Sequence, residues 1–263
     1  MSGRSSRGSV RDDAIVTRTE WPARDGILTS PALTALGVVA GFTTRPLGSM
    51  GGRATPPEDA EASRRTLAAR LGFDNVVRIK QVHGDEVVRA DEPFDPWPEA
   101  DAMWTDRAGV LLGVVAADCV PVLVADYEGR IGAAHAGWEG TTRFVARELI
   151  REMSDDGAEP SRMVAVVGPS IGPCCYAIGP DRTLLIRDRL GELSRGTLVT
   201  RGSETAFDLW TANVLQLRAE GVRTIEVSAL CTKCGGRDLW SYRGREEGET
   251  GTGLGLGFIG RRA

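Results

Sequence analysis

The sequence predicts a fold of the α/β class, a single domain in which helices and strands form mixed (α+β) layers. Three observations predict it. Apolar runs of strand length recur along the chain, amphipathic helical segments lie between several of them, and polar residues gather at strand ends. The chain has 263 residues, 41% hydrophobic and 26% charged, which is an ordinary globular composition and enough to bury a sizeable core.

Three segments carry helical patterns. Residues 50–73 read as a loop that runs into a helix, with Pro57 near the first turn, where proline is tolerated. Residues 141–153 have the spacing of an amphipathic helix. Residues 207–222 predict another helix, closed by Gly221, because glycine adopts the left-handed conformation that ends many helices.

Strands are predicted from short apolar runs between glycine, proline and acidic residues. Residues 109–126 are expected to form two buried strands, because Pro121 would break a helix. Residues 76–90 are expected to form two strands with a break at the sequence HGD. Single strands are expected at residues 130–138, 163–172 and 224–230, and a surface loop rich in proline and acidic residues at residues 95–106.

Charge and composition limit the classes of function. A formal net charge of -4 and a pI near 5.4 argue against a nucleic-acid-binding protein, which usually carries a basic face. No apolar run approaches the roughly 18 residues of a membrane span, and the polar first residues lack the apolar core of a secretory signal. We expect a cytoplasmic protein with a disordered tail at residues 1–20 and one catalytic domain at residues 21–263. With no export signal, the five cysteines are expected to be free thiols or ligands.

Three residues of metal-ligand type stand at the ends of apolar segments: His83, Cys119 and His135. The chain has only two histidines, and His135 lies among small residues in IGAAHAGWEGTT. Imidazole and thiolate are the usual ligands of zinc, and three protein ligands with an open fourth position are typical of a catalytic zinc site. The long spacing leaves two other interpretations open. The three are buried structural residues, or Cys119 is a nucleophile with His135 as its base.

Two further segments carry reactive or charged residues. Arg45 lies among glycines and hydroxyl residues in GFTTRPLGSMGG, where it either binds a phosphate or carboxylate or is a solvated arginine of a surface loop. The sequence CTKC, residues 231–234, looks like half a zinc knuckle or a redox pair. Since no second CxxC occurs, we predict neither a metal nor a redox role there, and we expect Cys174 and Cys175 to line a tight loop.

The order of the motifs is more specific than any one of them. From about residue 38 to the C-terminus the chain contains, in series, FTTRPLGS, KQVHGDEV, ADAMWTD, VVAADCVPVLVAD, GAAHAGWEGT, VGPSIGPCCYAIG, FDLWTANVLQL and CTKCGGRDLWSYR. Together these resemble the YfiH-type laccase-domain family, whose members carry the labels polyphenol oxidase, purine nucleoside phosphorylase and peptidoglycan editing factor.

The resemblance implies a fold related to the catalytic domain of cytotoxic necrotizing factors. It also implies a zinc ion bound by the histidine of QVHG, the cysteine of ADC and the histidine of HAGW, which are His83, Cys119 and His135. The implied activity is phosphorolysis of adenosine, inosine and methylthioadenosine to the base and ribose 1-phosphate, together with adenosine deamination. Zinc suits the deamination because it lowers the pKa of a bound water toward about 7. The catalytic roles fall to Cys119, His135 and Arg45.

Substrate contacts are expected from Arg45, Gln81 and Arg143. Arg45 matches a family arginine that is placed to hold phosphate. The sequence departs from the family at Glu139, where an arginine often follows HAGW, so that Arg143 would have to take over anion binding. The C-terminal TGR motif reads TGTGLGLG here and has also lost its arginine.

Three alternative functions use the same residues. A peptidoglycan-precursor editing amidase would use Cys119 or its zinc on muropeptide intermediates. A copper polyphenol oxidase ranks last: a His-His-Cys set resembles a blue-copper site, but a multicopper laccase needs many more histidines than two. The third alternative is binding without turnover. The expected partners are a small purine nucleoside and phosphate, with no nucleic acid and no membrane, and the expected assembly is a monomer or weak homodimer.

Overall fold

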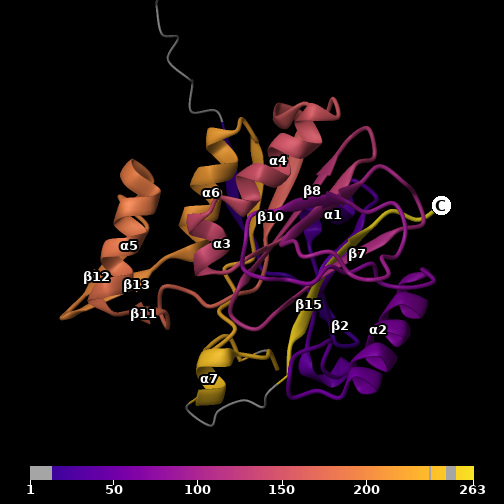
Figure 1. Cartoon of the computed structure of the whole chain (residues 1–263), viewed down its shortest axis with the longest axis horizontal. Coiled ribbons are helices and arrows are strands. Elements are labelled where there is room, and N and C mark those ends of the chain that lie inside the picture. The colour runs from indigo at the N-terminus through magenta and orange to yellow at the C-terminus, as the bar shows by residue number, and fades with distance from the viewer. Residues whose placement is uncertain (1–13, 237, 247–252) are drawn as a thin grey trace, which may run out of the picture.

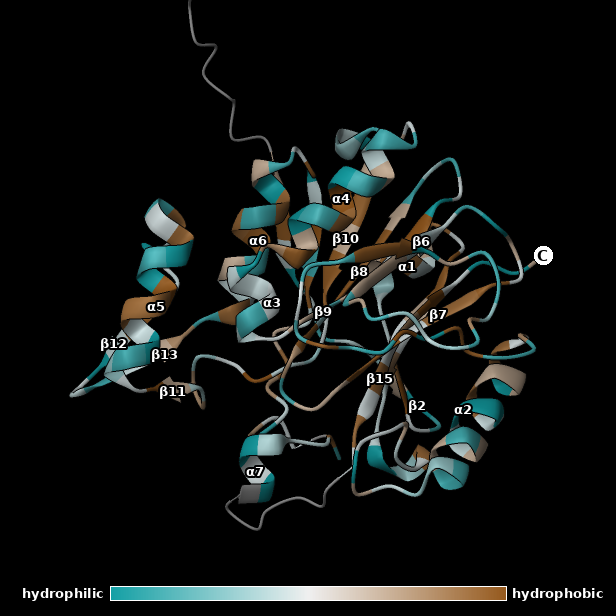
Figure 2. Ribbon diagram, viewed as in Figure 1, coloured by the Kyte–Doolittle hydropathy of each residue, from teal (hydrophilic) through white to brown (hydrophobic). Residues whose placement is uncertain are grey.

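Two β-sheets pack face to face, and helices cover the outer face of each (Figure 1). The computed structural model describes residues 14–236, 238–246 and 253–263. One apolar cluster lies between the two sheets, and another lies between each sheet and its helices. Figure 2 shows the strands of the interior in brown and much of the outer helical surface in teal. The predicted fold class, α/β with mixed layers, is therefore confirmed.

The large sheet has seven strands within the described residues. Its central strand is buried on both faces: Val120, Val122 and Val124 pack toward the helices, whereas Leu123 and Ala125 pack toward the second sheet. Burial on both faces explains why this stretch reads as a continuous apolar run. The strands, in spatial order, are β1 (Ile15–Arg18), β14 (Thr224–Val227), β10 (Met163–Val167), β8 (Val120–Asp126), β9 (Ile131–Ala136), β6 (Ala102–Thr105) and β5 (Val87–Arg89).

The second sheet is antiparallel throughout. Its strands, in spatial order, are β2 (Ala23–Arg24), β3 (Ile27–Thr29), β4 (Val39–Thr43), β15 (Gly255–Gly260) and β7 (Leu111–Ala116). The short helix α1 (Pro31–Ala35) follows β3, and the Ser30 hydroxyl caps it by accepting the N–H of Leu33 at 3.2 Å. β15 lies between β4 and β7, so residues from both ends of the chain pair in this sheet.

Helices α4 (Val145–Asp155) and α6 (Leu209–Ala219) cover the large sheet, and α2 (Pro57–Leu71) covers the second sheet. α3 (Trp138–Thr142) directly follows β9. A smaller sheet stands to one side with α5 (Pro180–Leu190), at the left of Figure 1. That sheet contains β11 (Ala177–Ile178), β13 (Glu204–Phe207) and β12 (Leu198–Arg201); the remaining elements are α7 (Tyr242–Glu246) and the 3-10 turns η1 (Arg45–Leu47), η2 (Pro160–Arg162) and η3 (Gly191–Ser194).

Most predicted elements are confirmed. Residues 109–126 form two strands, β7 and β8, separated by the polar break before Pro121. β9, β10 and β14 occupy the segments predicted as single strands. α2 lies within residues 50–73 and α6 within residues 207–222, with Gly221 in the left-handed conformation (φ 92°) just beyond the end of α6.

Other segments differ from the prediction. Residues 76–90 contain one strand, β5, because their first half forms only isolated bridges. Residues 95–106, predicted as a surface loop, contain β6, whose residues are all buried. The helix predicted at residues 141–153 is divided into α3 and α4, because Phe144 adopts a left-handed φ of 69° between them.

The predicted disordered tail also differs in its last part. Residues 15–18 form β1, which pairs in parallel with β14, and residues 1–13 lie outside the described residues. The sequence analysis predicted none of β2, β3, β4, β15, α1, α5, α7 and the small sheet. No helix in the described ranges is both long enough and apolar enough to cross a membrane.

Candidate metal centre and substrate cavity

The three predicted metal ligands lie at one end of the large sheet. Cys119 immediately precedes β8, and His135 lies in β9 opposite Pro121 of β8. His83 lies in the loop before β5. Because β8 and β9 are antiparallel, the start of one strand lies beside the end of the other, and this brings Cys119 and His135 together.

The ligand atoms of His83, Cys119 and His135 lie within 4.8 Å of one another. The two imidazole rings meet edge to face, with 4.9 Å between their centroids and 77° between their planes. His135 is buried, Cys119 is half-buried and His83 is exposed. The cluster is therefore anchored in the protein on the His135 side and accessible from solvent on the His83 side.

Asp101 holds both histidines in place, and sequence reasoning missed it. Its side chain is fully buried, and its Oδ1 lies 2.8 Å from Nδ1 of His135. Its Oδ2 accepts the backbone N–H groups of Val82, at 3.0 Å, and Gly84, at 2.7 Å, which flank His83. A carboxylate can only accept, so Nδ1 of His135 carries the proton and Nε2 is left for Cys119 or a metal. Asp101 directly precedes β6, in the segment predicted to be a surface loop.

The charges of the cluster shift the pKa values of its members. Burial by itself raises the pKa of Cys119, but the charge and hydrogen bonds of His135 and His83 outweigh it and lower that pKa to about 6. Burial lowers the pKa of His135, yet the Cys119 thiolate and Asp101 raise it to about 10. The hydrogen bond with Cys119 is the main reason that the pKa of His83 is raised. The cluster thus favours a thiolate, the form of cysteine that binds metals.

Gly137 leaves the space that the cluster occupies. A Cβ atom at this position would lie 2.8 Å from Sγ of Cys119 and 3.2 Å from Cδ2 of His83. Both distances are shorter than ordinary van der Waals contact, so any side chain here would displace the ligands. This explains why a glycine directly follows the strand that carries His135.

The donor set fits a metal ion. Two imidazole nitrogens and one thiolate are the donors that zinc and copper prefer. A carboxylate on the far nitrogen of a ligating histidine, as Asp101 is on His135, is the usual outer partner in such sites. The residues present therefore fit a single metal ion.

A cavity of about 680 Å³ opens over the cluster. Its polar and charged wall includes Gln81, Asp118, Glu139 and two arginines, Arg182 of α5 and Arg243 of α7. Sequence reasoning missed both arginines, although Arg243 lies in the quoted motif CTKCGGRDLWSYR. Three aromatic side chains, Trp138, Tyr176 and Tyr242, also line the cavity. A cavity with aromatic walls, a few polar groups and a cluster of perturbed pKa values is typical of a small-molecule site.

The backbone next to the cluster is strained. His83 and Asp118 adopt left-handed φ angles of 62° and 85°, which are uncommon for non-glycine residues. The Asp118 carboxylate compensates by accepting the Thr232 hydroxyl at 2.6 Å and the backbone N–H of Arg243 at 2.7 Å. These contacts tie the segment after β14 to the loop that carries Cys119.

The predicted substrate contacts are divided between the cavity and its surroundings. Gln81 lines the cavity, but its amide group donates to the carbonyl of Val115 at 2.9 Å and accepts the N–H of Val115 at 2.8 Å. Arg45 is not on the cavity wall; its guanidinium lies 2.9 Å from the carboxylate of Asp238. Arg143 is exposed at the end of α3 and is not on the wall either.

The chain is similar in sequence to known proteins. A sequence model of the family described as multi-copper polyphenol oxidoreductase laccase matches residues 43–261. The purine nucleoside phosphorylase of Deinococcus radiodurans is 39% identical over 242 residues, covering 85% of this chain and 92% of the relative. Adenosine deaminase RL5, from an unknown prokaryotic organism, is 33% identical over 211 residues, covering 73% of this chain and 80% of the relative.

The fold is also shared with solved structures. The crystal structure of YlmD from Geobacillus stearothermophilus superposes with a TM-score of 0.78 at 33% sequence identity, covering 92% of this chain and 99% of YlmD. The match of the family model runs from β4 to the end of β15 and includes all three residues of the cluster. The chain therefore belongs to the multi-copper polyphenol oxidoreductase laccase family, as the order of its motifs predicted.

Proposed function

We propose that this protein is a zinc-dependent purine nucleoside phosphorylase that also deaminates adenosine. The observation that carries the proposal is the His83–Cys119–His135 cluster at the wall of a cavity with aromatic and cationic sides. The names of the relatives, purine nucleoside phosphorylase and adenosine deaminase, supply the two reactions. In the first reaction, phosphate displaces the purine from C1 of the ribose. In the second, water attacks the adenine ring of adenosine, and the amino group leaves as ammonia.

His83, Cys119 and His135 would hold the zinc ion. When bound, zinc would supply Lewis acidity toward an oxygen atom of water or substrate. Asp101 fixes the orientation of His135 and of the backbone on both sides of His83, so the three donors need little rearrangement on binding. Zinc rather than copper is proposed because tetrahedral sites with one thiolate and two imidazoles are ordinary for zinc.

The cavity wall suits a nucleoside. Trp138, Tyr176 and Tyr242 offer aromatic faces to the flat purine. Glu139 offers a carboxylate acceptor to the N–H and O–H groups of the base and ribose. Gln81 has both amide atoms engaged with β7, so we assign it a positioning role in which it holds the wall of the cavity.

The phosphate needs positive charge on the wall. Arg182 and Arg243 line the cavity, and we propose that they bind the phosphate dianion through charge-assisted hydrogen bonds. Arg45, which the sequence predicts to contact phosphate directly, is proposed instead to act indirectly, by positioning other residues. Its backbone N–H donates to the carbonyl of Asp238, and its side chain pairs with the carboxylate of Asp238, near the segment that carries Arg243.

The free state of all five cysteines supports a reducing, cytoplasmic setting.

A product assay tests this function. Metal-loaded protein is incubated with adenosine, with and without phosphate, and the initial amounts of adenine, ribose 1-phosphate, inosine and hypoxanthine are quantified by mass, hypoxanthine being counted as deaminated product. We expect adenine only with phosphate and inosine under both conditions. His83→Ala and Cys119→Ser should lose both products together with the metal, and alkylation of Cys119 should require a chelator, because a bound thiolate is protected.

Muropeptide precursors and a phenolic substrate, assayed beside adenosine, cover the other activities considered. If protein that holds stoichiometric zinc does not turn over adenosine, the proposal is wrong. Loss of activity in Cys119→Ser with unchanged metal content would make Cys119 a nucleophile instead of a ligand.

A further inference from the structure

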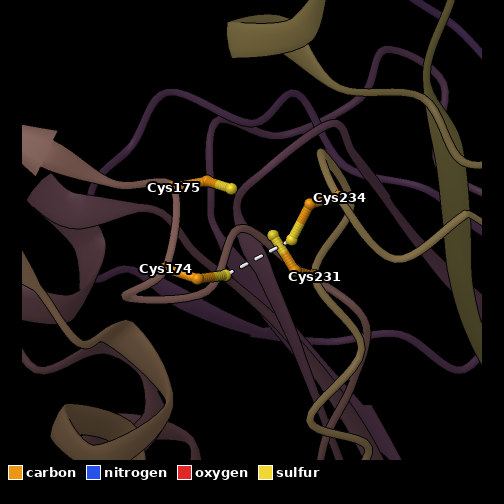
Figure 3. A group of neighbouring side chains, drawn as sticks. All are labelled: Cys174, Cys175, Cys231 and Cys234. Carbon is orange, nitrogen blue, oxygen red and sulfur yellow. Dashed lines mark hydrogen bonds between the residues drawn. The ribbon is translucent and has the colours of Figure 1, made fainter.

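A second group of metal-ligand residues, four cysteines whose sulfur atoms lie close together, is found outside the site described above (Figure 3). The Sγ atoms of Cys174, Cys175, Cys231 and Cys234 all lie within 4.8 Å of one another, and those of Cys174 and Cys234 are 3.5 Å apart. All four cysteines are free thiols. The sequence motif CTKC is therefore completed by the vicinal pair Cys174–Cys175, not by a second CxxC.

Parallel strands bring the two pairs together. β10 and β14 are parallel neighbours, so the loops after them leave the same edge of the large sheet. Cys174 and Cys175 follow β10, and Cys231 and Cys234 follow β14. Backbone bonds hold the loops in register: the N–H of Ser170 donates to the carbonyl of Leu230, and the N–H of Thr232 donates to the carbonyl of Ser170.

The backbone is arranged to favour a thiolate at Cys231. The N–H of Gly172 lies 3.3 Å from its Sγ, and the N–H groups of Lys233 and Cys234 also bond to it. Burial alone raises the pKa of Cys231, but these N–H groups lower it below its ordinary value. Gly235 closes the turn by donating to the carbonyl of Cys231 at 2.8 Å, where a Cβ atom would lie 2.4 Å from that oxygen. A CxxC turn with N–H groups directed at its first sulfur is suited to hold a metal ion.

Charge balance also favours a cation among the sulfurs. Burial comes first, and the hydrogen bonds with Cys234 and Cys231 and the charge of Cys231 add to it, in raising the pKa of Cys175 to about 12 and in raising that of Cys174. Further thiolates beside Cys231 would repel its negative charge. A thiol coordinated to a metal loses its proton, and the cation removes this repulsion. The guanidinium of Arg201 donates to the carbonyl of Cys174 at 3.0 Å, and Lys233 and Arg243 line the adjoining cavity together with Glu204. The excess of cationic groups would offset the negative charge of a four-thiolate site.

We propose that Cys174, Cys175, Cys231 and Cys234 bind one zinc ion in a tetrahedral all-thiolate site. Four sulfurs at about 2.3 Å from zinc lie roughly 3.8 Å apart, so the cluster needs only small side-chain movements. With four protein ligands the site is closed and structural. It fastens the loop of Ile171 and Tyr176 to the segment that leads to Tyr242 and Arg243, all of which line the substrate cavity.

Metal analysis of the whole protein tests the site. Zinc is measured in the wild type, in the double variant Cys231→Ser/Cys234→Ser, and in the double variant His83→Ala/His135→Ala. We expect each double variant to lose one ion and keep the other. Thermal melts of both show whether they are folded, and the ion that remains in the cysteine variant reports that the rest of the domain is intact.

Cadmium substitution of the wild type gives a readout that needs no variant. Two resonances are expected in the cadmium-113 NMR spectrum, one with the large shift of four sulfur ligands and one with the smaller shift of a mixed nitrogen–sulfur site. The absence of the four-sulfur resonance, or zinc content unaffected by Cys231→Ser/Cys234→Ser, overturns the proposal, whereas the absence of the mixed nitrogen–sulfur resonance alone counts against the site of His83, Cys119 and His135. The intact mass of the metal-free wild type, purified without oxidant, is a further check. A mass two hydrogen atoms below that of the fully reduced chain would show a disulfide in place of metal ligands and would also overturn the proposal.

Discussion

At the scale of single residues, the shape of the metal cluster depends on Gly137 as much as on the ligands themselves. Gly137→Ala should weaken metal binding, because its new methyl group meets Sγ of Cys119 at 2.8 Å. Overpacking of this kind typically costs about 1–3 kcal/mol. If the strain falls on the ligands, zinc affinity falls about tenfold or more, as competition with a chromophoric chelator would measure.

Gly179→Ala is a matched control for this substitution. Gly179 also precedes a helix, has a similar extended conformation, and has no atom within 4 Å of a Cβ placed on it. We expect Gly179→Ala to bind zinc like the wild type. Equal affinities of the two alanine variants would mean that the space beside Cys119 does not govern the site.

At the scale of elements, α5 brings a cation to the cavity from outside the sheets that carry the metal ligands. Arg182 of α5 lies over the ring of Trp138, 4.8 Å from its centroid, and both residues line the cavity. If Arg182 binds phosphate, Arg182→Ala should lower adenosine phosphorolysis by about 2–4 kcal/mol of transition-state binding. Deamination uses water, so it should change much less. The ratio of adenine to inosine, with phosphate present, measures the difference.

The same helix supplies the control. Arg187 is exposed on α5 and does not line the substrate cavity, so Arg187→Ala should leave the ratio unchanged. Arg45→Ala belongs in the same assay, because the sequence favoured Arg45 as the phosphate anchor. A ratio that falls in Arg45→Ala but not in Arg182→Ala would restore that expectation and remove Arg182 from the proposal.

β6 shows why an element of the site was missed in the sequence. Its residues, Ala102–Thr105, follow a run of proline and acidic residues that is typical of a surface loop. In the structure β6 pairs with β9 and is buried, because its neighbours cover both faces. Asp101 is then carried into the interior beside His135. A four-residue strand has too short a pattern for periodicity to separate it from a loop.

At the scale of the whole molecule, a buried carboxylate joins the N-terminal part of the chain to the large sheet. Glu226 of β14 accepts the hydroxyl of Ser30 at 2.7 Å and the N–H of Ala32 at 3.0 Å, both at the start of α1. Glu226→Ala would leave these two groups without their acceptor. We expect the free energy of unfolding to fall by about 1–3 kcal/mol, measured by urea denaturation, with zinc content unchanged.

Glu192→Ala is the exposed counterpart. Glu192 pairs with Arg195 while both side chains are about 80% exposed, and such surface pairs contribute little. We expect its effect on stability to stay within about 0.5 kcal/mol. A Glu226→Ala variant as stable as Glu192→Ala would show that the link between α1 and β14 does not support the fold.

Residue types and their periodicities along the chain are enough to predict part of the molecule. The sequence predicted the fold class, the strands β5, β7, β8, β9, β10 and β14, the helices α2 and α6, and His83, Cys119 and His135 as one group. Strand patterns depend on local burial, and histidine and cysteine are few in this chain and chemically distinctive, so both can be recognised without coordinates. The order of the motifs then predicted the family to which the chain belongs.

Contacts between residues far apart in the sequence depend on how the strands and helices pack. Asp101 reaches His135 because β6 pairs with β9, and Arg182 reaches the cavity because α5 folds back beside α3. Cys174 and Cys175 meet the CTKC segment because β10 and β14 are parallel neighbours, although about 60 residues separate the two pairs along the chain. Spacing along a chain says nothing about such pairings, since strand order and direction arise from how the sheets bury their apolar faces.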